Sequence, residues 1–323
     1  MKRRALVVSV CRAPGAALAQ KIAALAKQFD DVVVAVDDVD EPPAASLPAR
    51  WHAARQATAG VDTAWCTALP LSPTLPTRLE RVAALPVWLG TFDHVVVDNH
   101  DVAAILRVAA AAAPRPFTVE LAPRLGENGL PPPPPPPMPR ALVVTRAQPF
   151  HLGHLALIER ALEVAAEVVV VVGAAERSHE PRDPFTAGER LALVRAGLGP
   201  LAARVWLLAV PTPSWPALAL TTLWRLAPAV SCVVAHNRVL ASMATEMGLT
   251  VHRLDTAVGV DGEPISGTAV RARLAIVDDT STNTTAARLA WLQARVPDGV
   301  AAMLAAEPAL GARLRALALP EHG

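Results

Sequence analysis

Residues 140–172 read RALVVTRAQPFHLGHLALIERALEVAAEVVVVV, and residues 4–36 read RALVVSVCRAPGAALAQKIAALAKQFDDVVVAV. Each stretch contains a short apolar run, a turn, an amphipathic segment with helical period and a second run rich in valine. Short buried runs on both sides of a helix are typical of a βαβ unit with parallel strands. The two stretches align without a gap when Arg4 is set against Arg140. The sequence therefore predicts two copies of one α/β unit.

A second correspondence extends this repeat. VVVDN at residues 95–99 lies opposite VVAHN at residues 233–237, at nearly the same offset, and a helical pattern follows each segment. Two matches in the same order and at nearly the same spacing favour duplication of a whole domain over chance similarity between valine-rich strands. We therefore expect an α/β protein made of two tandem Rossmann-like domains with parallel sheets.

A proline tract separates the two copies. Seven consecutive prolines occupy residues 131–137. Proline cannot donate a hydrogen bond to a helix or sheet and favours the extended polyproline II rod. We expect a first domain at residues 1–120, a proline-rich linker at 121–139 and a second domain at 140–323. The tract itself is either a disordered spacer or a docking site for a proline-binding module.

Composition limits the environment and the partners. Charged residues make up 18% of the chain and the net charge is +1, so no electrostatic argument favours nucleic acid or an anionic membrane as partner. The apolar run after residues 1–4 resembles part of a secretory leader, but Arg12 and Pro14 interrupt it. No apolar stretch approaches the roughly 18 residues that cross a bilayer.

The cysteines give no sign of a disulfide framework or a metal site. Cys11, Cys66 and Cys232 are scattered and lack the short spacings of zinc ligands. We read them as reduced thiols, and we expect a cytoplasmic protein without metal ligands of its own. Whether it forms a homo-oligomer is left open.

The second copy carries a pair of histidines in a chemically informative place. RAQPFHLGH at residues 146–154 lies between a predicted strand and a predicted helix. Gly153 lets the backbone approach a ligand closely, and the start of the helix offers free N–H groups and a positive dipole end to phosphate. His151 and His154 are three residues apart, so both can face the same anion. This arrangement predicts a phosphate-binding site.

Two further segments add polar groups. SH at residues 178–179 is followed by DPFTAGER at residues 183–190, and ISGTAVR occupies residues 265–271. The hydroxyls and the glycine of the last segment can present donors at a helix start, and Arg271 lies about one turn further on. Such a run alone is usually only a helix cap. Downstream of the histidine pair, it predicts a second phosphate clamp.

Together these motifs resemble those of the archaeal-type nicotinamide mononucleotide (NMN) adenylyltransferases, members of the HxGH nucleotidyltransferase superfamily. The similarity runs from about Ala141 to Leu304. The resemblance implies transfer of AMP from ATP to the phosphate of NMN, which gives NAD and pyrophosphate, with Mg²⁺ accompanying the ATP. ATP and a small phosphorylated acceptor are the implied partners.

The resemblance also assigns residues to roles. It implies catalytic roles for His151, His154 and Arg271. The ATP ligands that it implies are Arg146, Gln148, Phe150, Gly153, Asn237, Ser266, Gly267 and Thr268. The acceptor contacts that we expect are Ser178, His179, Asp183 and Trp215.

The chain departs from the family pattern where the acceptor would be chosen. The family's stacking tryptophan is missing from its usual spacing, although Trp215 stands nearby, and no acid follows Pro211. His236 replaces the glycine that the family has before its asparagine. Two alternatives therefore stay open: transfer to another phosphorylated or phosphonate acceptor in a specialised pathway, and a non-catalytic nucleotide sensor.

The first copy lacks the reactive side chains. In the alignment of Arg4 with Arg140, Gly15 and Leu18 stand where the second copy has its two histidines. We expect this copy to keep the fold without the catalysis. The polar cluster DNHD at residues 98–101 is either a retained ligand site at a strand end or a solvated loop.

Overall fold

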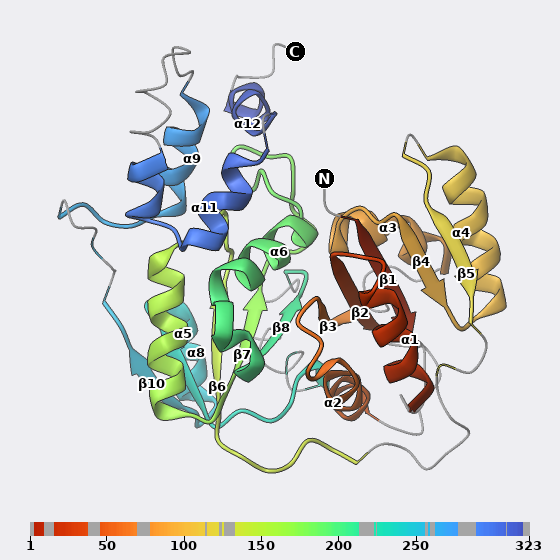
Figure 1. Ribbon diagram of the computed structural model, residues 1–323. Coiled ribbons are helices and arrows are strands. Elements are labelled where there is room, and N and C mark those ends of the chain that lie inside the picture. The colour runs from red at the N-terminus through yellow and green to blue at the C-terminus, as the bar shows by residue number, and fades with distance from the viewer. Residues whose placement is uncertain are drawn as a thin grey trace. The chain divides into compact units, whose positions relative to one another are not determined.

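The computed structural model describes residues 3–9, 16–37, 46–69, 78–113, 115–122, 125, 133–212, 223, 225–255, 258, 262–276, 289–307 and 309–318. The chain divides into two compact units, one made mainly of residues 1–137 and the other mainly of residues 138–323 (Figure 1). The predicted domain limits at residues 120 and 140 stay a prediction. Among the described helices, none is both long and apolar enough to cross a bilayer.

The first unit contains one five-stranded sheet in the order β3-β2-β1-β4-β5, and each neighbouring pair is parallel. Helices α1 and α2 pack on β2, and α4 packs on β4 and β5. The strands are β1 (Arg4–Ser9), β2 (Asp31–Asp37), β3 (Ala64–Leu69), β4 (His94–Val97) and β5 (Thr118–Leu121), and the helices are α1 (Ala16–Ala26), α2 (Leu47–Thr58), α3 (Arg78–Leu89) and α4 (His100–Ala112).

The second unit contains another five-stranded sheet, in the order β10-β9-β6-β7-β8. The pairs β10–β9, β9–β6 and β6–β7 are parallel. Helix α5 packs on β6, β7 and β9, and α8 packs on β9 and β10. The elements are β6 (Arg140–Thr145), α5 (Leu152–Val164), β7 (Glu167–Val172), α6 (Ala187–Leu198), the 3₁₀ helix η1 (Gly199–Arg204), β8 (Val205–Ala209), β9 (Cys232–Ala235), α8 (Arg238–Glu246), β10 (Thr250–Arg253), α9 (Gly267–Ala275), α11 (Asp298–Ala305) and α12 (Leu310–Ala318).

The two sheets have the same topology. When the second is written as β8-β7-β6-β9-β10, its strands follow the same sequence order as those of the first. The predicted α/β class with parallel sheets is confirmed. In both units the second strand is almost wholly buried and rich in valine, as expected for a parallel strand with both faces covered.

A polar cluster at the start of the first sheet supports this equivalence. The Arg4 Nε lies 2.8 Å from Oδ2 of Asp31, and the Trp65 Nε1 donates to Oδ1 of the same carboxylate at 3.0 Å. The cluster therefore joins the beginnings of β1, β2 and β3 through one acidic side chain.

The second sheet has the matching cluster. The Arg140 Nε lies 2.7 Å from Oε2 of Glu167, and the Trp206 Nε1 donates to that oxygen at 2.9 Å. Here the acidic side chain joins the beginnings of β6, β7 and β8. Both sheets thus have an arginine, an acid and a tryptophan at equivalent places. This shared cluster is stronger evidence of common origin than a shared pattern of valines, and it favours duplication of an ancestral domain.

Candidate active site

The loop between β6 and α5 carries the histidine motif. It leaves the strand after Thr145, whose Oγ1 accepts a hydrogen bond of 3.1 Å from the Ala147 amide. His151 occupies the position before the first turn of α5, and its backbone is extended. Gly153 is the second residue of the helix, where a backbone amide has no acceptor within the helix. The predicted strand–loop–helix setting of the motif is therefore present.

The two histidines are held against one another. The His151 backbone N–H donates to Nδ1 of His154 at 3.2 Å, and the two rings stack with their centroids 3.6 Å apart. Because Nδ1 of His154 accepts, the proton of its neutral ring sits on Nε2. The turn thus fixes one tautomer and leaves an Nε2–H donor.

Burial keeps both rings neutral. It lowers the pKa of His151 to about 4 and holds the pKa of His154 well below 6.5, and a charge on His236 acts in the same direction. Both rings are therefore uncharged near pH 7. Nδ1 of His151 is buried without a hydrogen-bond partner among the described residues.

The start of α9 lies against this loop. Ser266 caps the helix by accepting from the Ala269 amide at 3.2 Å. Arg271 donates through Nη1 to the Gln148 carbonyl at 2.6 Å and through Nη2 to Oγ1 of Thr268 at 3.2 Å. The two predicted phosphate-binding motifs, far apart in sequence, are thus in direct contact.

Gly267 permits this contact. A Cβ at this position would lie 2.5 Å from the Gln148 carbonyl oxygen, a separation that real Cβ atoms do not adopt. Only glycine lets the first turn of α9 come so close to the backbone of the loop. Gly267 therefore has a steric role in addition to the ATP contact that we expect of it.

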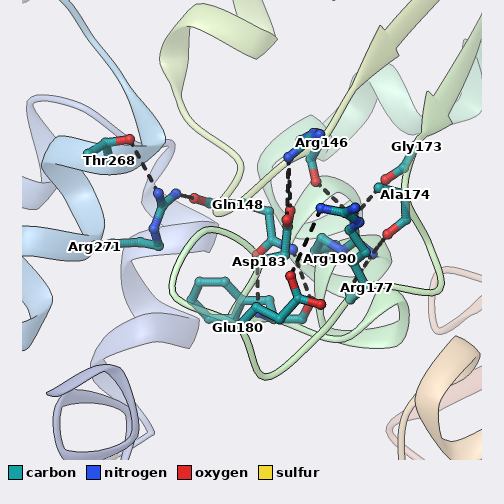
Figure 2. A network of polar contacts seen from close by, with 11 residues as sticks. Arg146, Gln148, Gly173, Ala174, Arg177, Glu180, Asp183, Arg190, Thr268 and Arg271 are labelled. Carbon is teal, nitrogen blue, oxygen red and sulfur yellow. Dashed lines mark hydrogen bonds and ion pairs between the residues drawn. The ribbon is translucent and has the colours of Figure 1, made fainter. Parts of the chain in front are cut away.

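Arg146 is tethered beside the same loop (Figure 2). Its Nη1 lies 3.3 Å from Oδ2 of Asp183, which is fully buried, whereas the Arg146 side chain is 58% exposed. The carboxylate therefore orients a cation that still faces solvent. Burial and this ion pair give Asp183 a positioning role, and the acceptor contact expected of it stays a prediction.

Arg190, at the end of the DPFTAGER segment, links the loops around the site. Its side chain is fully buried and donates to five main-chain carbonyls. Burial lowers its pKa to about 10, so it remains charged near pH 7. The five acceptors, several of them drawn in Figure 2, are the carbonyls of Arg146, Gly173, Ala174, Arg177 and Thr186.

Known proteins match this part of the chain. Residues 142–202 match the family model described as Cytidylyltransferase-like. A nicotinamide-nucleotide adenylyltransferase of Methanolobus tindarius is 31% identical over 137 residues, which are 42% of this chain and 78% of the relative. The nicotinamide-nucleotide adenylyltransferase of Methanosarcina mazei is 33% identical, again over 42% of this chain and 78% of the relative. The chain belongs to the nicotinamide-nucleotide adenylyltransferase family.

The solved structure of another protein with NMN adenylyltransferase in its name also matches. It is a bifunctional NMN adenylyltransferase/ADP ribose pyrophosphatase of Francisella tularensis, complexed with AMP and a manganese ion. It is 16% identical, with a TM-score of 0.37, and the match covers 53% of this chain and 52% of that one.

Within this family member, two expected ATP ligands have structural roles. The Gln148 side chain donates to the Phe185 carbonyl at 3.1 Å and accepts from the Phe185 amide at 3.0 Å. Phe150 is fully buried and stacks against His154 with ring centroids 5.6 Å apart. Contact of the Gln148 and Phe150 side chains with ATP stays a prediction beside these structural contacts. The two side chains hold the loop on the segment that leads into α6 and pack against the histidine.

The remaining expected site residues have different surroundings in the structure. Asn237 caps α8, since its Oδ1 accepts from the Val239 amide at 2.8 Å, and the side chain stays exposed. Ser178 and His179 lie in the loop after β7, where Nδ1 of His179 is 3.0 Å from the Ser178 Oγ. Their roles stay predictions. Trp215 lies outside the described residues.

Two residues near the site were not among the expected ones. Arg190 is the last residue of the DPFTAGER segment. Its burial and its five carbonyl partners could not be predicted from the sequence. His236 was noted only as a departure from the family pattern. The structure places it directly after β9, on the strand next to β6.

Proposed function

We propose that the second unit transfers AMP from ATP to the phosphate of NMN, producing NAD and pyrophosphate. The contact of Arg271 with the Gln148 carbonyl is the observation that carries this proposal, because it joins the two phosphate-binding motifs at one edge of the sheet. The curated relatives are nicotinamide-nucleotide adenylyltransferases, which supports NMN as the acceptor.

The chemistry needs no nucleophile from the protein. An oxygen of the NMN phosphate forms a bond to the α-phosphorus of ATP, while the bond from that phosphorus to the bridging oxygen of pyrophosphate breaks. The barrier lies in bringing anions together and in spreading charge over the transferring group. Donors fixed before the reaction lower it most effectively.

The residues of the site suit this task. In the proposed complex, the Nε2–H of His154 and the Gly153 amide donate to phosphate oxygens at the start of α5. Arg271 and Arg146 supply positive charge, which the neutral histidines do not. The Asp183 carboxylate offsets part of the Arg146 charge and also acts on Arg271.

Magnesium enters this scheme as part of the magnesium–ATP substrate. Among the residues that the structure describes, no group of three or more His, Cys, Asp or Glu side chains could hold a metal ion. Mg²⁺ retains several waters and binds substrate phosphates readily. The ion is therefore proposed to be held by the triphosphate and water.

The first unit is proposed to be non-catalytic. When Arg4 is aligned with Arg140, Leu18 is the counterpart of His154. Leu18 is a fully buried apolar residue of α1 and offers no donor to phosphate. The second predicted counterpart, Gly15, lies outside the described residues.

The proposed function is tested by incubating the full chain with magnesium and ATP or CTP, together with NMN or other phosphorylated acceptors. We expect ATP and NMN to yield NAD and pyrophosphate in equal amounts. Pyrophosphate release only with a different acceptor would replace NMN by that compound. ATP binding without pyrophosphate release under any condition would indicate a nucleotide sensor.

A further inference from the structure

His236 lies at the same edge of the second sheet as the histidine motif. It directly follows β9, and Asn237 after it caps α8. Strands β6 and β9 are parallel neighbours, with Ala141 opposite Cys232. Continued to the ends of both strands, this register sets His236 level with Thr145, where the loop that carries the histidine motif begins.

This edge is the topological switch point of the sheet. From β6 the chain builds β7 and β8 on one side, and β9 and β10 lie on the other. In open α/β sheets, ligands bind outside the carboxyl ends of the strands at such a point. Helices α5 and α8 both begin there, and the positive dipole ends of helices attract anions.

The ring of His236 is available at this point. The residue is exposed, whereas His151 and His154 are buried. Its charge lowers the pKa of both buried histidines, which places it near them because such interactions weaken with distance. Capping of α8 is done by Asn237, and no described residue forms a hydrogen bond with the His236 ring.

We propose that His236 contacts the polyphosphate of the bound nucleotide and forms the third imidazole of the site. This inference rests on the proposed function and adds a residue to it. His236 approaches from the end of β9, whereas His151 and His154 approach from the start of α5. Nδ1 of His151 is buried without a partner among the described residues, which leaves a second polar atom of the histidine motif for a ligand to bond.

The test compares His236→Ala and His236→Gln with the unchanged chain. Binding of ATP, inorganic tripolyphosphate and adenosine is measured by calorimetry, and unfolding temperature is measured in parallel. We expect His236→Ala to weaken ATP and tripolyphosphate roughly 10- to 100-fold, the worth of one hydrogen bond to a charged group, and to leave adenosine unchanged. Glutamine keeps an N–H donor and is expected to restore part of the loss.

His252→Gln is the matched control, because this histidine lies within the outer strand β10, opposite Val234, and β9 separates β10 from β6. It is expected to bind all three probes normally. Unchanged tripolyphosphate binding in His236→Ala would overturn the inference, as would a loss confined to adenosine, which would indicate contact with the base. If the unchanged chain binds ATP and releases pyrophosphate, either result leaves the proposed function intact. An unchanged chain that does neither would overturn both.

Discussion

Nη1 of Arg271 lies 2.6 Å from the main-chain carbonyl oxygen of Gln148, a residue 123 positions earlier in the chain. The same guanidinium reaches Oγ1 of Thr268 through Nη2. Arg271 is therefore oriented by two acceptors before any ligand binds. Burial lowers the pKa of Arg271, and the Asp183 carboxylate acts in the opposite direction.

Replacement of Arg271 tests whether this orientation matters for catalysis. We expect Arg271→Ala to lower kcat/KM for ATP by about 10²-fold or more, because a donor aimed at phosphate charge is lost. Arg271→Lys keeps the charge but cannot form both contacts of a planar fork, so it is expected to recover only a small part. Pyrophosphate release at several ATP concentrations measures both. Full activity in Arg271→Lys would show that charge alone suffices.

Gly267→Ala tests the close approach of α9 to the histidine loop. The added Cβ would overlap the Gln148 carbonyl, so α9 must move and the free energy of unfolding should fall by about 1–3 kcal/mol. Activity is expected to fall with it. Gly173→Ala is the control, since a Cβ there meets its nearest atoms at 3.9 Å. Equal stability in the two variants, measured by urea unfolding, would contradict the steric argument.

Arg190 is expected to be a determinant of stability. The Arg190 guanidinium donates to five carbonyls and interacts with the buried Asp183 carboxylate. Arg190→Gln removes this buried charge, so the free energy of unfolding should fall by about 3–5 kcal/mol. Arg160→Gln is the control, because its ion pair with Glu163 is exposed and worth about 1 kcal/mol or less. A loss no larger than that of the control would show that the carbonyl contacts contribute little.

The neutral histidines predict a loss of stability in mild acid. His151 has a pKa of about 4 in the folded protein, below its ordinary value of 6.5, so the unfolded chain takes up the proton first as pH falls. The stabilisation is complete above about pH 6.5 and is lost towards pH 4. Between pH 7 and pH 5, His151 alone should account for about 2 kcal/mol. His154 acts in the same direction.

His151→Gln isolates this contribution. Glutamine does not titrate, so the variant should lose less stability than the unchanged chain when urea unfolding is compared at pH 7 and pH 5. An identical loss in both proteins would show that other groups, such as carboxylates, dominate the acid sensitivity.

Much of the fold followed from the sequence because it depends on repeated, local patterns. The gapless repeat from Arg4 to Arg140 predicted that the strands and helices of one copy recur in the other, and the sheet orders agree. The histidine pair and the Ser-Gly-Thr segment were each placed at a helix start. Spacing alone could indicate these positions, because capping and helix dipoles act over a single turn.

The direction and burial of individual side chains could not be predicted in the same way. Gln148 and Phe150 stand inside the motif, yet tertiary packing turns one towards Phe185 and buries the other against His154. The nearness of His236 to the motif depends on the pairing of β9 with β6, which is a property of the assembled sheet.

The second unit is proposed to make NAD from ATP and NMN, with His154 donating a hydrogen bond to phosphate. The most direct test of this proposal is the rate of NAD formation by the full-length protein and by His154→Ala at saturating ATP and NMN, with unfolding temperature recorded for both. We expect the unchanged chain to form NAD and the variant to be slower by about 10²-fold or more while remaining folded. Equal rates would contradict the role of His154, and a folded, unchanged chain that forms no NAD would contradict the proposed function.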